Sequence, residues 1–143
     1  MTEAFPLSDD LLHAMRNAAR KSIELREPVI TPRAILLALL DDAVVGPALT
    51  TVVNRDKVLA AQFEESIGSP DDTLAFKTPD GRTSLWLSRE AYAIFLEGAQ
   101  RVQERYTSKH LALGLAAQAR LSPGILSAIR VDPGALSEAI YKL

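Results

Sequence analysis

Apolar residues recur at helical spacing along most of the chain, and the pattern occurs twice. Residues 30–40 read ITPRAILLALL and residues 106–116 read YTSKHLALGLA, so that in both stretches a Thr precedes an apolar run and a basic residue follows two places later. The same spacing of 76 residues pairs Asp56 with Asp132. Because this match extends beyond one helix, the chain is predicted to be a tandem repeat.

Each copy is predicted to begin with a capped helix. Ser8 is followed by Asp9 and Asp10, so a hydroxyl can accept from free backbone N–H groups while two acids lie at the positive end of the helix dipole. The three- and four-residue spacing of apolar positions carries this helix to about Leu25. Ser88 begins the equivalent helix of the second copy.

The next helix follows Thr31 and is apolar on nearly all sides, which predicts a central position. Thr31 is a suitable N-cap, and Pro32 suits the first helical position because its missing N–H is not needed there. Asp41 and Asp42 are unfavourable at a C-terminal dipole and predict the end of the helix. Thr107 precedes the corresponding helix in the second copy.

Two shorter helices are expected to complete each copy. Gly46-Pro47 is predicted to open the third helix, and Asp56 to cap a fourth that reaches about Ile67. The corresponding starts in the second copy are Ser122-Pro123 and Asp132-Pro133.

The predicted fold class is therefore all-α, with two tandem pseudo-equivalent four-helix repeats packed as one eight-helix domain. This single domain is expected over 1–143, with repeat one at about 7–67, a linker at about 68–87 and repeat two at about 88–143. The turn signal at residues 78–81, TPDG, makes a β-hairpin in the linker an alternative. We favour an irregular linker, because isolated two-stranded hairpins are marginally stable.

Composition excludes several classes of function. With 16 Lys+Arg against 18 Asp+Glu the net charge is −2, which lacks the basic footprint of a nucleic-acid-binding protein. The absence of cysteine removes disulfides, thiolate nucleophiles and most zinc sites. No apolar run of membrane-spanning length and no signal-peptide pattern occur, so we expect a cytoplasmic protein that does not bind membranes.

The residues that carry catalytic or metal chemistry in other proteins form no convincing group here. His13 and His110 are the only histidines, and no Cys or carboxylate cluster stands at ligand spacing around either, so no metal and no cofactor are predicted. His110 is expected to be a core histidine whose ring caps a neighbouring turn. Most Ser and Thr residues lie where helix caps are needed, which argues against an enzyme.

Large apolar residues precede the first helix of each copy. Their expected role is either to close the bundle between the two copies or to line a surface groove for a peptide, where an aromatic side chain would serve as an anchor. These candidates are Phe5 and Leu7 in the first copy and Leu85, Trp86 and Leu87 in the second.

The sequence resembles the Clp N-terminal repeat domain, as found in the N-domains of ClpC- and ClpA-type unfoldases. Residues 110–115, HLALGL, and 131–136, VDPGAL, carry the resemblance best, and it covers about residues 5–143. Ala34 departs from the pattern, since the family usually has His there. The first copy matches through Thr31, residues 36–40 and Asp56.

The resemblance implies a non-catalytic protein- or peptide-binding module that recruits substrates or adaptors to a Clp-type ATP-dependent unfoldase and protease. Its partners would be Clp unfoldase or protease components, adaptor proteins or substrate peptides. The chain has no G-x-x-x-x-G-K-[ST] loop, so we expect a module without the ATPase. The alternatives are a structural accessory subunit of the Clp protease core and a stand-alone decoy that captures peptides without delivering them.

The resemblance also bears on ligand choice. In relatives of the ClpC branch that bind phosphoarginine, the position before the His of the helix-opening motif is Glu in both repeats and receives the guanidinium group. Arg33 and Lys109 occupy these positions here, so phosphoarginine binding is not expected. Either both residues are simply solvated near a helix start, or they direct the surface towards acidic segments of a partner.

Overall fold

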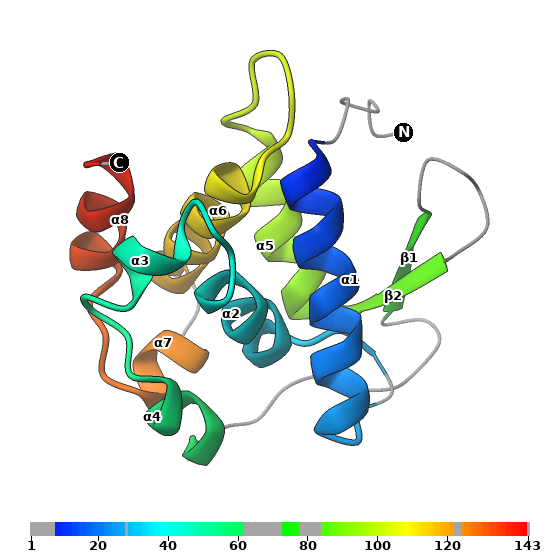
Figure 1. Cartoon of the computed structure of the whole chain (residues 1–143), viewed down its shortest axis with the longest axis horizontal. Coiled ribbons are helices and arrows are strands. Elements are labelled where there is room, and N and C mark those ends of the chain that lie inside the picture. Colours follow the sequence, from blue (N-terminus) through cyan, green and yellow to red (C-terminus); the bar gives the residue numbers. More distant parts are fainter. Residues whose placement is uncertain (1–7, 28, 62–72, 78–83, 122–123, 143) are drawn as a thin grey trace.

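The computed structural model describes residues 8–27, 29–61, 73–77, 84–121 and 124–142 (Figure 1). Within these ranges the chain forms eight helices and one two-stranded sheet, so the predicted all-α class is confirmed, with a small hairpin added. The helices are α1 (Asp9–Glu24), α2 (Pro32–Leu40), α3 (Gly46–Leu49), α4 (Arg55–Ala60), α5 (Arg89–Ala99), α6 (Ser108–Leu121), α7 (Ile125–Ala128) and α8 (Pro133–Tyr141).

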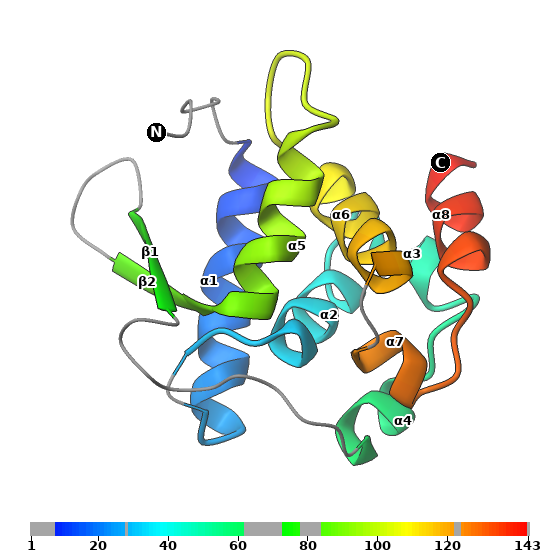
Figure 2. The same cartoon turned by 180° about the vertical axis from the view of Figure 1, so that it is seen from behind.

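Helix α2 lies at the centre, as its apolar sequence predicts. In both views α1 and α5 lie on one side of it and α3, α4, α7 and α8 on the other (Figures 1 and 2). All residues of α2 except Arg33 are buried. One continuous cluster of buried side chains includes residues of both copies, among them Leu36, Leu39, Leu111 and Leu115. The two copies therefore share a core.

The predicted helix starts are largely confirmed. Four side-chain oxygens accept the backbone N–H three residues ahead, at 3.1 to 3.3 Å, and these belong to Ser8, Thr31, Ser88 and Asp132. The prediction that Asp56 caps the fourth helix is wrong. Asn54 is the N-cap of α4, because its Oδ1 accepts from the N–H of Asp56 at 2.9 Å and of Lys57 at 3.3 Å. The predicted end at Ile67 and the predicted start at Ser122-Pro123 lie outside the described residues.

The expectation of an irregular linker is also wrong for part of its length. Strand β1 (Thr73–Lys77) pairs antiparallel with β2 (Ser84–Ser88), in the register that places Thr73 opposite Ser88. The hairpin is not isolated, because Leu87 makes a parallel bridge to Ile30 and is itself buried in the core. This attachment to the helical core gives the hairpin the packing without which a free two-stranded hairpin is only marginally stable. The turn at 78–81 lies outside the described residues.

Two reciprocal hydrogen bonds join the copies. The backbone N–H of Ser8, the N-cap of α1, donates to the carbonyl of Tyr106 at 2.9 Å. The backbone N–H of Ser88, the N-cap of α5, donates to the carbonyl of Ile30, also at 2.9 Å. The two acceptors are equivalent, since Tyr106 and Ile30 each lie just before the Thr that precedes the second helix of their copy. The first helix of each copy is therefore held at its start by the other copy. Each copy therefore depends on the other to satisfy its backbone.

Helices α5 and α6 cross closely through two glycines. A Cβ on Gly114 would meet the carbonyl oxygen of Ile94 and would lie 2.5 Å from the backbone N of Gly98. Beside this crossing the hydroxyl of Tyr106 donates to the carbonyl of Phe95 at 2.7 Å, and the two rings stack with centroids 4.5 Å apart. Burial raises the pKa of Tyr106, so it remains a neutral donor.

Candidate functional site

Arg33 and Lys109 occupy equivalent places, since each is the second residue of its helix, α2 or α6. Both side chains are partly exposed. The guanidinium of Arg33 donates to the carbonyl of Ala61, just beyond α4. Lys109 instead lines a cleft beside the loop that follows α5. The two predicted basic residues thus lie in different surroundings.

The apolar candidates are placed only in part. Leu87 is 2% exposed and belongs to the core cluster, which is the bundle-closing role rather than the groove-lining one. The backbones of Leu85 and Trp86 lie in β2. The side chains of these two residues, together with Phe5 and Leu7, fall outside what the structure describes.

His110 has a capping role, as the sequence predicts, but it caps the first turn of its own helix, and it is partly exposed rather than fully in the core. Its Nδ1 lies 3.0 Å from the backbone N of Thr107 and 3.1 Å from the Thr107 hydroxyl. Because a backbone N–H can only donate, Nδ1 accepts, and the proton of the neutral ring is on Nε2. Burial and the charge of Lys109 lower the pKa of His110, while Asp10 opposes them. The ring is therefore neutral at pH 7.

A buried polar network holds the N-terminus of α6. The hydroxyl of Ser108, which is fully buried, lies 2.7 Å from Oδ2 of Asp10 and 3.1 Å from Oδ2 of Asp42. Asp42 also accepts the backbone N–H groups of Val44 and Val45, each at 2.9 Å. One hydroxyl proton can serve only one carboxylate at a time. The arrangement fixes α1, α6 and the turn after α2 relative to one another. Because the Ser108 hydroxyl is buried, it is not accessible as a nucleophile.

The pKa of Asp10 reflects this network. Its partial burial alone would raise the pKa, but hydrogen bonds donated by Ser8 and Ser108 outweigh burial, so the pKa falls below its usual range. Asp10 is thus ionised at neutral pH and accepts from the start of α6.

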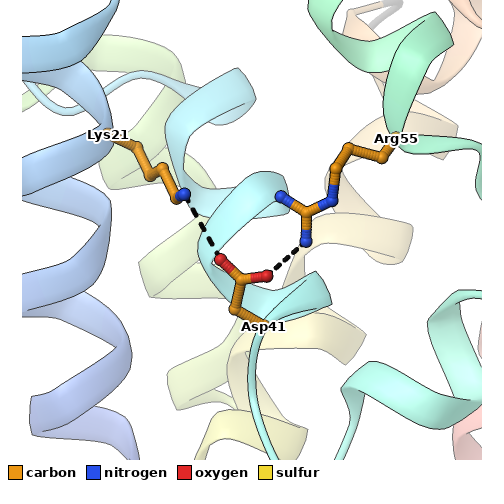
Figure 3. Close-up of polar contacts among 3 residues, drawn as sticks. All are labelled: Lys21, Asp41 and Arg55. Atoms are coloured by element: carbon orange, nitrogen blue, oxygen red, sulfur yellow. Dashed lines mark hydrogen bonds and ion pairs between the residues drawn. The ribbon is translucent and has the colours of Figure 1, made fainter.

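Asp41, the C-cap of α2, joins two other helices (Figure 3). Its carboxylate lies 3.4 Å from Nζ of Lys21 on α1 and also pairs with the guanidinium of Arg55 on α4. Burial opposes ionisation of Asp41, but the hydrogen bonds and charges of Arg55 and Lys21 lower its pKa overall. All three side chains are partly exposed, so the cluster positions α4 more than it stabilises the fold.

One cleft of the second copy, of about 660 Å³, lies between the loop after α5, the start of α6 and the end of α8. A smaller cavity of about 310 Å³ shares Arg101, Leu113 and Tyr141 with it, so the two adjoin. A third cleft, of about 510 Å³, lies between α4 and α7 and includes Lys57 and Arg130. Sequence reasoning identified Lys109 in the first cleft but missed Arg101 and Tyr141, whose proximity depends on tertiary packing.

Neither metal-binding nor membrane-spanning features are found in the described part of the chain. There, no three His, Cys, Asp or Glu side chains gather as they would around a metal ion. Among those same residues no helix has both the length and the apolar character to cross a bilayer.

The fold has a known counterpart. No family model and no curated protein matches the sequence. Among solved structures, the N-terminal domain of the caseinolytic protease associated chaperone ClpD from Arabidopsis thaliana superposes with a TM-score of 0.65 over 99% of this chain and 96% of that chain. The chain has a Clp N-domain-like fold. Only 14% of residues are identical, so the likeness concerns the fold, and the Clp N-domain-like arrangement includes both copies.

Proposed function

We propose that this chain is a non-catalytic module that recruits substrates or adaptors to a Clp-type unfoldase and protease. The observation that carries the proposal is the structural match to the N-terminal domain of a Clp-associated chaperone over almost the whole of both chains. Its partners would be Clp components, adaptor proteins or substrate peptides, in the cytoplasm.

The polar chemistry of the described residues supports a binding role. The serine and histidine best placed for chemistry, Ser108 and His110, are both engaged in fixing the start of α6. In contrast, three basic side chains that line the clefts are exposed or partly exposed, namely Arg105, Lys109 and Arg130. Charged, accessible side chains at the rim of a cleft are suited to partner selection.

Co-purification from native cytosol separates this function from its alternatives. Recovery of an unfoldase together with adaptors or substrates supports recruitment. Recovery of peptidase subunits without an unfoldase supports a structural accessory subunit of the protease core. Recovery of peptides or proteins with neither would indicate a decoy, and recovery of no specific partner would contradict all three.

Phosphoarginine is not expected to be a ligand. A guanidinium group would meet a like charge at both Arg33 and Lys109, and the Coulomb energy of such a pair is unfavourable. Calorimetric titration with free phosphoarginine at low salt should therefore give no heat of binding. Tight binding that is abolished by Arg33→Ala or Lys109→Ala would overturn this expectation.

A further inference from the structure

The two cavities of the second copy that share Arg101, Leu113 and Tyr141 together form one groove, here called the α6 groove. It follows α6 between the loop after α5 and the end of α8, which flank α6 in Figure 1. Its defining side chains are Arg101, Arg105, Lys109, Leu113, Arg120 and Tyr141. Because the lining runs from the loop after α5 to the end of α8, it offers an extended segment several separate contact points.

The groove carries an excess of positive charge. Arg101 is compensated, since its guanidinium lies 3.7 Å from the carboxylate of Glu97 and also donates to the Glu97 carbonyl at 2.6 Å. Within the described ranges, Arg105, Lys109 and Arg120 form no ion pair, while Glu104 is the other acid in the lining. Three cations against one acid leave a local excess in a chain whose net charge is −2.

Apolar side chains also line the groove. Tyr141 is 63% exposed and Leu121 is 71% exposed, and both line the smaller cavity beside Leu113. Large exposed apolar side chains gathered in a hollow are typical of interaction sites. In addition, the neutral ring of His110 lines the larger cavity and carries its proton on Nε2, which can donate to an acceptor.

We propose that the α6 groove binds an acidic linear segment of a partner protein, in which carboxylates alternate with apolar or aromatic side chains. The carboxylates would meet Arg105, Lys109 and Arg120, and the apolar side chains would pack on Leu121 and Tyr141. The charge excess is too small, and the chain too acidic, for a phosphate backbone, which favours proteins with many cationic contacts. The proposal rests on the proposed function in taking the occupant to be a protein segment.

Binding of a short labelled peptide in which Glu alternates with Leu and Phe tests the proposal by fluorescence anisotropy. The wild-type chain should bind it, and binding should weaken as salt rises from about 50 to about 200 mM, because the groove charges are screened. A peptide with Lys in place of every Glu should not bind. A single-stranded oligonucleotide that binds more tightly than the acidic peptide would overturn the proposal.

Paired charge reversals locate the site. Arg105→Glu/Lys109→Glu should weaken binding at least about tenfold, which corresponds to about 1.4 kcal/mol. The matched control is Arg16→Glu/Arg20→Glu, which makes the same change in net charge on the exposed face of α1 and should alter the affinity less than about twofold. Equal losses in both variants would show attraction to overall charge and would refute a specific groove.

A measurement on the wild-type chain guards against misfolded variants. Nuclear magnetic resonance shifts caused by the acidic peptide should concentrate in residues 100–113 and at Tyr141. Shifts centred instead on the α4–α7 cleft, around Lys57 and Arg130, would place the segment elsewhere and reject the α6 groove.

Co-purification with the groove variant keeps this inference separate from the proposed function. If wild-type chain and Arg105→Glu/Lys109→Glu recover the same Clp components, substrates and adaptors in equal amounts, the groove proposal fails and the recruiting function stands. If the acidic peptide binds in the groove but no Clp component co-purifies with the wild-type chain, the recruiting function fails and the groove proposal stands.

Discussion

Replacing Gly114 with alanine tests the close crossing of α5 and α6. The new Cβ would meet the carbonyl oxygen of Ile94 and would lie 2.5 Å from the backbone N and 2.9 Å from the Cα of Gly98. All three atoms belong to the backbone of α5, so no side-chain rotation relieves the overlap. The helices must move apart, which disturbs the stacked Phe95 and Tyr106 rings and the core around them.

The expected magnitude follows from two opposing contributions. Alanine is more favourable than glycine inside a helix by about 0.8–1.0 kcal/mol. Overpacking costs about 1–3 kcal/mol, and occasionally more where the backbone itself must shift. With the overpacking cost near its upper end, Gly114→Ala should lower the free energy of unfolding by about 2 kcal/mol. For a domain near 150 residues this corresponds to a fall in Tm of about 4–8 °C.

Differential scanning calorimetry measures this loss against a matched glycine. Gly134, in α8, is the control because a Cβ there would meet only side-chain atoms, the nearest being an Asp132 carboxylate oxygen at 3.1 Å. Gly134→Ala should change stability by less than about 1 kcal/mol in either direction. An unchanged Tm for Gly114→Ala would show that the two helices do not need their close approach, and the reasoning would be refuted.

Three further predictions concern the shared core, pH dependence and the hairpin. Leu36→Asp should unfold both copies in one calorimetric transition, since it places an unpaired charge at a fully buried position of α2, and separate melting of one copy would contradict a shared core. Because burial depresses the pKa of His110 below 6.5, its contribution to stability is complete above about pH 6.5 and declines as the pH falls towards the folded-state value. His110→Gln keeps an acceptor for the Thr107 N–H, so the Tm of this variant should fall less with decreasing pH than the Tm of the wild type. Identical profiles of Tm against pH for the two proteins would rule the mechanism out. Trp86 fluorescence should shift when a recovered partner is titrated, with Trp86→Ala weakening binding by more than about 1 kcal/mol, whereas unchanged affinity with a large loss of stability would assign Trp86 to the core.

Local chemistry made the helix starts predictable. Ser8, Thr31, Ser88 and Asp132 cap helices because a side-chain oxygen followed by a helical pattern satisfies free N–H groups, and this depends only on neighbouring residues. The same reasoning chose Asp56 over Asn54, two residues that are both good caps. Which of the two is the N-cap depends on where the chain turns after α3. The periodicity of apolar residues does not define that turn.

Contacts between distant residues account for what the sequence did not reveal. The hairpin is held through the bridge of Leu87 to Ile30, a pairing across more than fifty positions of the chain that no local pattern specifies. For the site, the repeat pairs Lys109 with Arg33, which made its place near a helix start predictable, and a capping role was expected for His110, although for a neighbouring turn. Tyr141 and Arg101 join the same groove because α8 and α5 both pack on α6, and no sequence spacing encodes that packing.

Recruitment itself can be measured with the partner recovered by co-purification. The initial rate of its ATP-dependent degradation by a Clp-type unfoldase and peptidase is followed as purified chain is added. If the chain recruits, the rate should rise with chain concentration and reach a plateau as the partner becomes bound, and Arg16→Glu/Arg20→Glu should behave as the wild type does. A rate that stays constant or falls as chain is added would contradict recruitment and would be the behaviour of a decoy.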